Sequence, residues 1–250
     1  MDIQKKIKRN FQLQTFDIDN KTEEIQYLRT IASGYAVTEN AIAVVSDLRN
    51  NVSYIYYGGL AEILGIAESY SSETVNSIWE DRIYGSIPKD DLTKKHINEL
   101  RFYNFIKNIP PQKRKGYYVK EAIRMFSKEG KSFPVIHRMH YFYEKDYNSI
   151  RFSLCLYNLR GNHEPETSSI LNSIGFQSYA LDAEHDKSIL SDREKEILQL
   201  IDKGMSSIEI SEILSISKNT VSRHRQNILE KLQAKNSIEA CKTAKEMKLI

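Results

Sequence analysis

Polar and basic side chains gather in one short stretch, ISKNTVSRHRQNILEKL, residues 216–232. Val221, Ile228 and Leu232 recur there at helical spacing, about 100° per residue, which predicts a helix with one buried face. Such a helix presents its other side chains to solvent or to a partner. Asn219, Arg223, Gln226 and Glu230 fall opposite the buried face, with Ser222 on one rim and Thr220, His224, Asn227 and Lys231 on the other.

These side-chain types match the chemistry of duplex DNA. In the major groove, arginine forms paired hydrogen bonds with guanine, and asparagine or glutamine forms them with adenine. Lysine and arginine neutralise phosphates, a role we assign to Lys218, Arg225 and Lys231, and the helix N-terminus adds partial positive charge. A merely solvated charged face is the alternative for any single residue. The predicted DNA-binding residues are Ser217, Lys218, Asn219, Thr220, Ser222, Arg223, His224, Arg225, Gln226 and Lys231.

Capping signals around this stretch define the helices that must hold it. SDRE at 191–194 and SSIE at 206–209 are capping boxes, in which the serine accepts from a free backbone N–H and the glutamate reaches back. Residues 215–217 separate the second helix from the third, and NSIE at 236–239 opens a fourth. Two short helices joined by a three-residue turn have the helix-turn-helix geometry. We therefore predict an all-α, four-helix helix-turn-helix domain over 189–250.

Residues 190–250 resemble the LuxR/NarL-type DNA-binding domain along their whole length. The resemblance implies base recognition through Ser222, Arg223 and Gln226, which agrees with the helical pattern. A lysine is common in the family at the positions of Ser222 and Gln226, so a known target sequence does not transfer. The matching features are Leu190-Ser191-x-Arg193-Glu194, Gly204-Met205-Ser206, Glu209-Ile210, Ile216-Ser217, Thr220-Val221-x-x-His224, Asn227-Ile228 and Lys231-Leu232.

The same resemblance implies a dimer contact through the fourth helix, at about 236–247. Small residues on this helix would let two copies approach closely, and a two-fold contact is self-complementary. One helix in one groove makes too few contacts for a usable specificity, so we expect a homodimer on an inverted repeat. The predicted dimerisation residues are Ala240, Cys241, Ala244 and Met247.

The first part of the chain predicts two strands around an Asn50-Asn51 turn, short helices, a long helix at 90–109 and a three-stranded meander at 117–159. This order resembles a PAS sensor fold over about 37–160, with IPKDDL at 87–92 before the long helix. The resemblance implies an α+β domain with an antiparallel sheet and helices on one face. The chain then divides into an N-terminal extension with a short helix at 22–32 (1–36), a PAS-like sensor domain (37–160), a linker with a helix at 167–174 (161–188) and the helix-turn-helix domain (189–250).

Together these features predict a sequence-specific DNA-binding transcription regulator whose PAS-like domain senses a small molecule or mediates dimerisation. The alternative is a phosphorylation-controlled response regulator with a divergent receiver domain, in which Asp47 follows a strand. A receiver needs a parallel sheet, and the meander argues against one. An acyl-homoserine-lactone sensor would bring several tryptophans, whereas Trp79 is the single one. The predicted partners are double-stranded DNA, a second copy of the chain, RNA polymerase and a small-molecule ligand of unknown identity.

Composition narrows the function classes further. The formal net charge is +3 over 250 residues, too small by itself to indicate a nucleic-acid partner. No apolar run approaches the length of a membrane span, so no membrane partner is expected. The N-terminal MDIQKKIKRNFQ lacks the apolar stretch of a secretory signal, and two distant cysteines, Cys155 and Cys241, suit a reducing compartment. We expect a cytoplasmic protein.

Neither an enzyme nor a metal site is expected. The chain has no glycine-rich phosphate loop, nucleophile elbow or paired metal ligands, and no cofactor is assigned. His96 lies in the long helix, where haem-binding PAS domains place an axial ligand, but its position at the edge of the apolar stripe predicts a solvated side chain. His137 and His140 fall on opposite faces of one strand and cannot share a metal ion.

Overall fold

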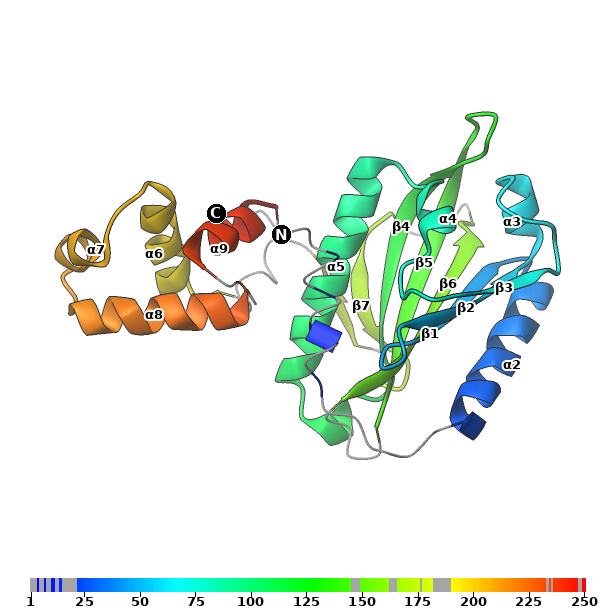
Figure 1. Cartoon of the computed structure of the whole chain (residues 1–250), viewed down its shortest axis with the longest axis horizontal. Helices are drawn as coiled ribbons and strands as arrows, with labels where there is room; N and C mark the ends of the chain where they lie inside the picture. The colour runs from blue at the N-terminus through cyan, green and yellow to red at the C-terminus, as the bar shows by residue number, and fades with distance from the viewer. Residues whose placement is uncertain are drawn as a thin grey trace.

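The computed structural model of the chain describes most of its residues. These are 22–144, 149–161, 166–175, 177–181, 190–232, 234, 236–246 and 249–250, together with Gln4, Ile7, Asn10, Phe11 and Gln14. Figure 1 shows a sheet flanked by helices and a separate bundle of short helices.

The sheet has eight strands in the order β3-β2-β1-β6-β5-β4-β7-β8, and every neighbouring pair is antiparallel. Its central part, β2-β1-β6-β5-β4, places the first hairpin beside the last strand of the meander. An antiparallel sheet is incompatible with a receiver domain, so the phosphorylation-controlled alternative is wrong. The strands are β1 (Ile42–Asp47), β2 (Val52–Tyr57), β3 (Ser72–Val75), β4 (Tyr117–Phe126), β5 (Ser132–Tyr143), β6 (Ile150–Leu159), β7 (Ser169–Asn172) and β8 (Ser178–Ala180).

The turn between β1 and β2 is held by Asp47. Its carboxylate accepts hydrogen bonds from the backbone N–H groups of Arg49 and Asn50 at 3.1 and 2.9 Å, and from the Arg151 guanidinium at 3.0 Å. Asn51 then takes a left-handed φ of 54°, which asparagine tolerates better than most residues. The residue that a receiver would present for phosphorylation is thus buried in a turn here.

Helices cover both faces of the sheet. One face carries α3 (Gly59–Ile63), α4 (Asp81–Tyr84) and the 20-residue α5 (Lys89–Asn108), which a short 3-10 turn, η1 (Pro111–Lys113), follows. On the opposite face lies α2 (Thr22–Thr38), which is visible on the far side of the sheet from α5 in Figure 1. The fold class is confirmed, with one addition: the second face of the sheet is also covered.

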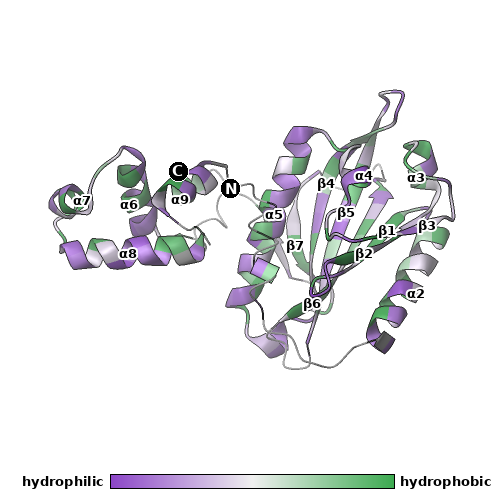
Figure 2. Cartoon of the chain, in the orientation of Figure 1, coloured by the Kyte–Doolittle hydropathy of each residue, from purple (hydrophilic) through white to green (hydrophobic). Residues whose placement is uncertain are grey.

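The packing of α2 explains this second layer. Leu28, Ala32 and Ala36 recur every fourth residue and are buried against Ala43 on β1 and Leu154 on β6. Figure 2 shows hydrophobic residues on α2 and on the strands beside it. The predicted helix at 22–32 is therefore too short, because this contact carries the helix past Gly34 to Thr38.

The segment expected to be a linker holds two strands. β7 pairs with β4 from Tyr117↔Asn172 to Lys120↔Ser169, and β8 pairs with β7. The expected helix at 167–174 is therefore wrong. The outer edge of β4 offers backbone donors and acceptors that need partners, and this tertiary demand outweighs the weak local pattern. Residues 162–165 and 182–189 lie outside the described part of the chain.

The C-terminal bundle follows the predicted caps. Its helices are α6 (Asp192–Asp202), α7 (Ser207–Ile213), α8 (Lys218–Lys231) and α9 (Ser237–Glu246). Ser191 with Glu194, and Ser206 with Glu209, form complete capping boxes. Gly204 ends the turn after α6 with a φ of 85°, a conformation that glycine adopts without strain. The predicted four-helix, all-α C-terminal fold is confirmed.

Across the part of the chain that the structure describes, no helix is both long and apolar enough to cross a membrane.

Gly58 allows the end of α2 to pack closely against the start of the sheet. We expect Gly58→Ala to lower the free energy of unfolding by about 3 kcal/mol. A Cβ there would lie 2.2 Å from the carbonyl oxygen of Ala36 and 2.6 Å from that of Ala41, so backbone must move. Gly34→Ala is the control, because nothing lies within 4 Å of its Cβ and alanine favours helix, which adds about 0.5–1 kcal/mol. Urea denaturation of both variants measures the difference, and equal stability would contradict the packing of α2.

Candidate nucleic-acid interface

Helix α8 is fixed at its start and along one side. The backbone N–H of Thr220 donates to the Ser217 hydroxyl at 3.1 Å, which caps the first turn. Val221, Ile228 and Leu232 are each at most 1% exposed and pack in the core formed with α6 and α7. Because these three side chains point inward, the rotation of the helix about its axis is set.

The opposite side of α8 is open. Of the predicted DNA-binding residues, Ser217, Lys218, Asn219, Thr220, Ser222, Arg223 and Gln226 are exposed, and His224 is half-buried on the rim. Within the described residues, the structure shows no hydrogen bond or ion pair for the side chains of Lys218, Arg223 and Gln226. An ammonium group, a guanidinium group and an amide are therefore exposed on one face of α8, where a DNA duplex could bind.

Arg225 faces the protein rather than solvent. Its guanidinium donates to the Ser207 hydroxyl at 2.9 Å and to the Ser237 hydroxyl at 3.1 Å. Ser207 begins α7 and Ser237 begins α9, so one arginine on α8 joins the starts of two other helices. This geometry gives Arg225 a structural role within the domain.

Lys231 likewise has a partner inside the domain. Its ammonium group lies 2.7 Å from a carboxylate oxygen of Glu194, whose side chain is only 3% exposed. Desolvation raises the pKa of Glu194, but hydrogen bonds from Lys231 and from the Ser191 backbone outweigh it and hold that pKa below its ordinary value. The ion pair therefore stabilises the fold above the ordinary glutamate pKa, and this contribution is lost as the pH falls.

The predicted dimerisation residues are buried in their own domain. Ala240 and Ala244 are fully buried and Cys241 is 7% exposed, with its thiol directed at the Leu198 carbonyl on α6. Small residues here let α9 approach α6 and α8, and this intramolecular packing removes them from any intermolecular contact. The dimer seam predicted for these three residues is therefore wrong, and Met247 lies outside the described residues.

Residues 188–244 match the family model for bacterial regulatory proteins of the luxR family. The C-terminal region is a LuxR-family helix-turn-helix domain. Within it, α7 and α8 are the helix-turn-helix pair, and the open side of α8 is the face that sequence analysis assigned to DNA.

Curated relatives match part of the chain. The uncharacterized response regulatory protein YgeK of Escherichia coli (strain K12) is 48% identical over 58 residues, which are 23% of this chain and 40% of that protein. The transcriptional regulatory protein DesR of Bacillus subtilis (strain 168) is 38% identical over 96 residues, 36% of this chain and 48% of that protein. This chain thus matches less than half the length of each.

Solved structures resemble the chain only distantly. The dimer of VqmA from Vibrio cholerae, described as a LuxR-type receptor, covers 92% of this chain and 88% of its own at 15% identity and a TM-score of 0.29. SdiA of Escherichia coli covers 97% of both chains at 17% identity and a TM-score of 0.25. Similarity this low transfers no ligand and no assembly to the chain described here.

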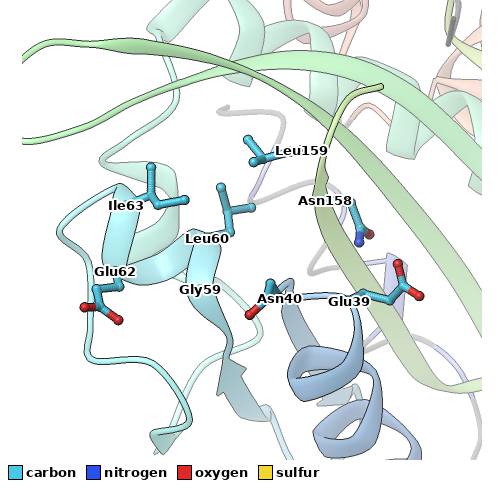
Figure 3. Close-up of a pocket in the computed structure, with 8 residues that line it drawn as sticks. All are labelled: Glu39, Asn40, Gly59, Leu60, Glu62, Ile63, Asn158 and Leu159. Atoms are coloured by element: carbon cyan, nitrogen blue, oxygen red, sulfur yellow. The ribbon is translucent and has the colours of Figure 1, made fainter. Parts of the chain in front are cut away.

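The PAS-like domain has a large hollow on its surface. It has a volume of about 580 Å³ and lies where the end of α2 meets α3 and β6. In Figure 3, Glu39 and Glu62 lie on opposite sides of it, with Asn40 and Leu60 between them. The hollow is open, and its residues Ile63 and Leu159 are 46% and 48% exposed, so water reaches its polar groups.

His96 is not solvated as expected. It is 5% exposed and lies edge-on to Trp79 and Tyr84, with ring centroids 5.8 and 5.5 Å away. On this side, α5 packs against α4 and against the loop that precedes α4. The sequence of α5 alone does not reveal this long-range contact. Among the described residues, no group of three histidine, cysteine, aspartate or glutamate side chains is arranged to hold a metal ion.

Replacing Arg225 with alanine should destabilise the LuxR-family domain, because the hydroxyls of Ser207 and Ser237 lose a charged donor. We expect a loss of about 1–3 kcal/mol. Arg223→Ala, on the open face, should change stability by less than about 0.5 kcal/mol. Residues 190–250 contain no aromatic residue, so hydrogen exchange of the α6–α9 amides is the suitable measurement. Equal protection in the two variants would contradict the structural role of Arg225.

Proposed function

We propose that this protein is a sequence-specific DNA-binding transcription regulator. The observation that carries the proposal is the open face of α8, where Lys218, Arg223 and Gln226 have no partners among the described residues. The helix itself is fixed by its N-terminal cap and by the burial of its opposite face. Arg223 and Gln226 are one helical turn apart and present paired donors and acceptors, which suit guanine and adenine edges. Function on DNA implies a cytoplasmic protein, in keeping with two free, buried cysteines.

The proposal assigns the phosphate contacts to the start of α8. Lys218 is the first residue of that helix, and the free backbone N–H groups of the first turn add partial positive charge beside it. Arg225 and Lys231 are not included, because both are bound within the domain. Base reading then rests on Ser222, Arg223 and Gln226, with Asn219 beside them, and RNA polymerase stays a predicted partner.

We further propose that the PAS-like domain supplies the signal and that the protein works as a homodimer on an inverted repeat. The support for a signal is a small, mostly apolar cavity between the sheet and α5, whose wall includes two buried carboxylates. For the dimer, α9 offers Ile238, which is 84% exposed on a helix whose small residues all face inward. Tyr27 and Ile31, 67% and 40% exposed on α2, give the N-terminal region a second apolar surface.

Arg223→Ala should reduce affinity for the true operator by about 1–3 kcal/mol and relax the preference at one base position. Lys218→Ala should weaken binding to all sequences alike and flatten the dependence of log K on log salt by about one unit. Titration of specific and random duplexes at several salt concentrations separates the two effects. If Arg223→Ala behaved as the lysine variant does, the assignment of the base-reading face would be wrong.

Ile238→Glu should leave the fold intact and weaken binding to an inverted repeat, with affinity for a single half-site unchanged. Ala244→Glu is the contrast, because it buries an unpaired charge in the domain core and should cost about 3 kcal/mol or more of stability. Band-shift titration on one and two half-sites measures the first effect, and hydrogen exchange measures the second. Unchanged affinity of the Ile238→Glu variant for the inverted repeat would show that α9 does not form the dimer contact.

A further inference from the structure

A small cavity lies inside the PAS-like domain, between the sheet and the helices α4 and α5. Its volume is about 30 Å³, room for about two water molecules. Its wall is largely aromatic and apolar, and Ile7 and Phe11 of the N-terminal segment help to close it. The lining includes Phe11, Trp79, Glu80, Tyr84, Glu99 and Tyr141.

Two carboxylates in this wall are incompletely bonded. Glu80 and Glu99 are 3% and 5% exposed, and one oxygen of each has no hydrogen-bond partner. The remaining groups of both are engaged: Glu80 bonds to the Tyr84 hydroxyl, and Glu99 pairs with the ammonium group of Lys95. A buried carboxylate oxygen that lacks a donor costs free energy, so each is an acceptor awaiting a donor.

The wall also carries more negative than positive charge. Lys95 is fully buried, pairs with Glu99 and also acts on Glu80, so one buried cation serves two buried carboxylates. Burial raises the pKa of Glu80 to about 7, although Lys95 and Tyr84 oppose the rise. Several titratable groups act on Glu80 and its neighbours. They are Tyr84 on α4, Lys95 and Glu99 on α5, Glu121 on β4, and Cys155 and Tyr157 on β6.

A third buried carboxylate, Glu121, has a hydrogen-bond partner at each of its oxygens. Glu121 accepts from the Asn98 amide at 2.8 Å, and its other oxygen lies 2.8 Å from the His137 ring nitrogen Nδ1. It does not line the cavity. Of the three carboxylates Glu80, Glu99 and Glu121, the two that line the cavity are thus the ones with an open oxygen.

We infer that the cavity binds the cationic head of a small organic molecule, a protonated primary amine or an amidinium, with N–H donors to Glu80 and Glu99. The inference deepens the proposed sensing function and rests on it. Such a head supplies the missing positive charge and at least two donors, while the faces of Trp79, Tyr84 and Phe11 suit a cation. The present volume admits only the head, so the body of a larger ligand lies where Ile7 and Phe11 now close the cavity.

The full-length protein tests this with matched charged and neutral probes. Methylammonium and acetamidinium chloride should raise the melting temperature of the PAS-like domain above that in equal sodium chloride, and methanol and acetamide should not. Because a cation needs the ionised carboxylate, the affinity measured by calorimetry should increase as the pH rises through about 7. Neutral probes that bind as well as their charged partners, or no response to either cation, would overturn the inference.

Variants locate the site. Glu80→Gln keeps the shape and removes the charge, and it should weaken methylammonium binding by about tenfold or more, as expected when a charged acceptor is lost. Glu121→Gln, at a carboxylate outside the cavity, should bind the cation as the parent does. If Glu80→Gln fails to fold, the methylammonium affinity of Glu99→Gln is measured in its place. Unchanged affinity in folded Glu80→Gln and Glu99→Gln would place the cation elsewhere and refute the site.

The outcome is separable from the proposed function. Operator binding by the parent protein tests DNA recognition, and it does not depend on which ligand the cavity takes. A melting shift with a neutral metabolite, together with silence toward both cations, would overturn the cationic class and leave the sensing role standing.

Discussion

The burial of one aliphatic face of α8 is the constraint on which the DNA-facing surface depends. Val221, Ile228 and Leu232 can be removed from water only if the helix sits at one rotation on α6 and α7. That rotation carries Arg223 and Gln226 outward without any further interaction. One helix thus forms part of the core and also presents the proposed base-reading residues, and a change to its buried face would turn those residues away from the open side.

Two basic residues of α8 hold the domain together. Arg225 ties the starts of α7 and α9, and Lys231 closes on the nearly buried Glu194 at the start of α6. These contacts keep the short helices in register, which matters because α7 has only 7 residues and would not be stable alone. Arg225 and Lys231 are thus bound within the domain, and Lys218 at the start of α8 is the proposed phosphate contact.

The N-terminal domain is organised in the opposite sense, with charge inside. Its sheet is covered on both faces, and the α5 face buries Lys95, Glu99 and Glu80. Removing charges from water is costly, and a well-packed apolar core would be at least as stable. The PAS-like domain nevertheless keeps these charged side chains in its interior. Closure by Ile7 and Phe11 brings the N-terminal segment into contact with that interior.

The sequence by itself determined the helix-turn-helix domain, the long α5, the first hairpin and the meander. Each is encoded locally, by capping boxes, by apolar periods of 3.6 or 2 residues and by turn residues such as Asn51 and Gly204. Local signals of this kind also placed Arg223 and Gln226 on the open face of α8. Only the tertiary structure decided which side chains find partners at long range. It turned Ala240 and Ala244 into the domain core, gave Arg225 and Lys231 internal partners, buried His96 and added β7 and β8 to the edge of β4. Small, basic and edge-pairing residues look alike in sequence whether they meet their own chain or another molecule, because the forces that bind them are the same in both cases.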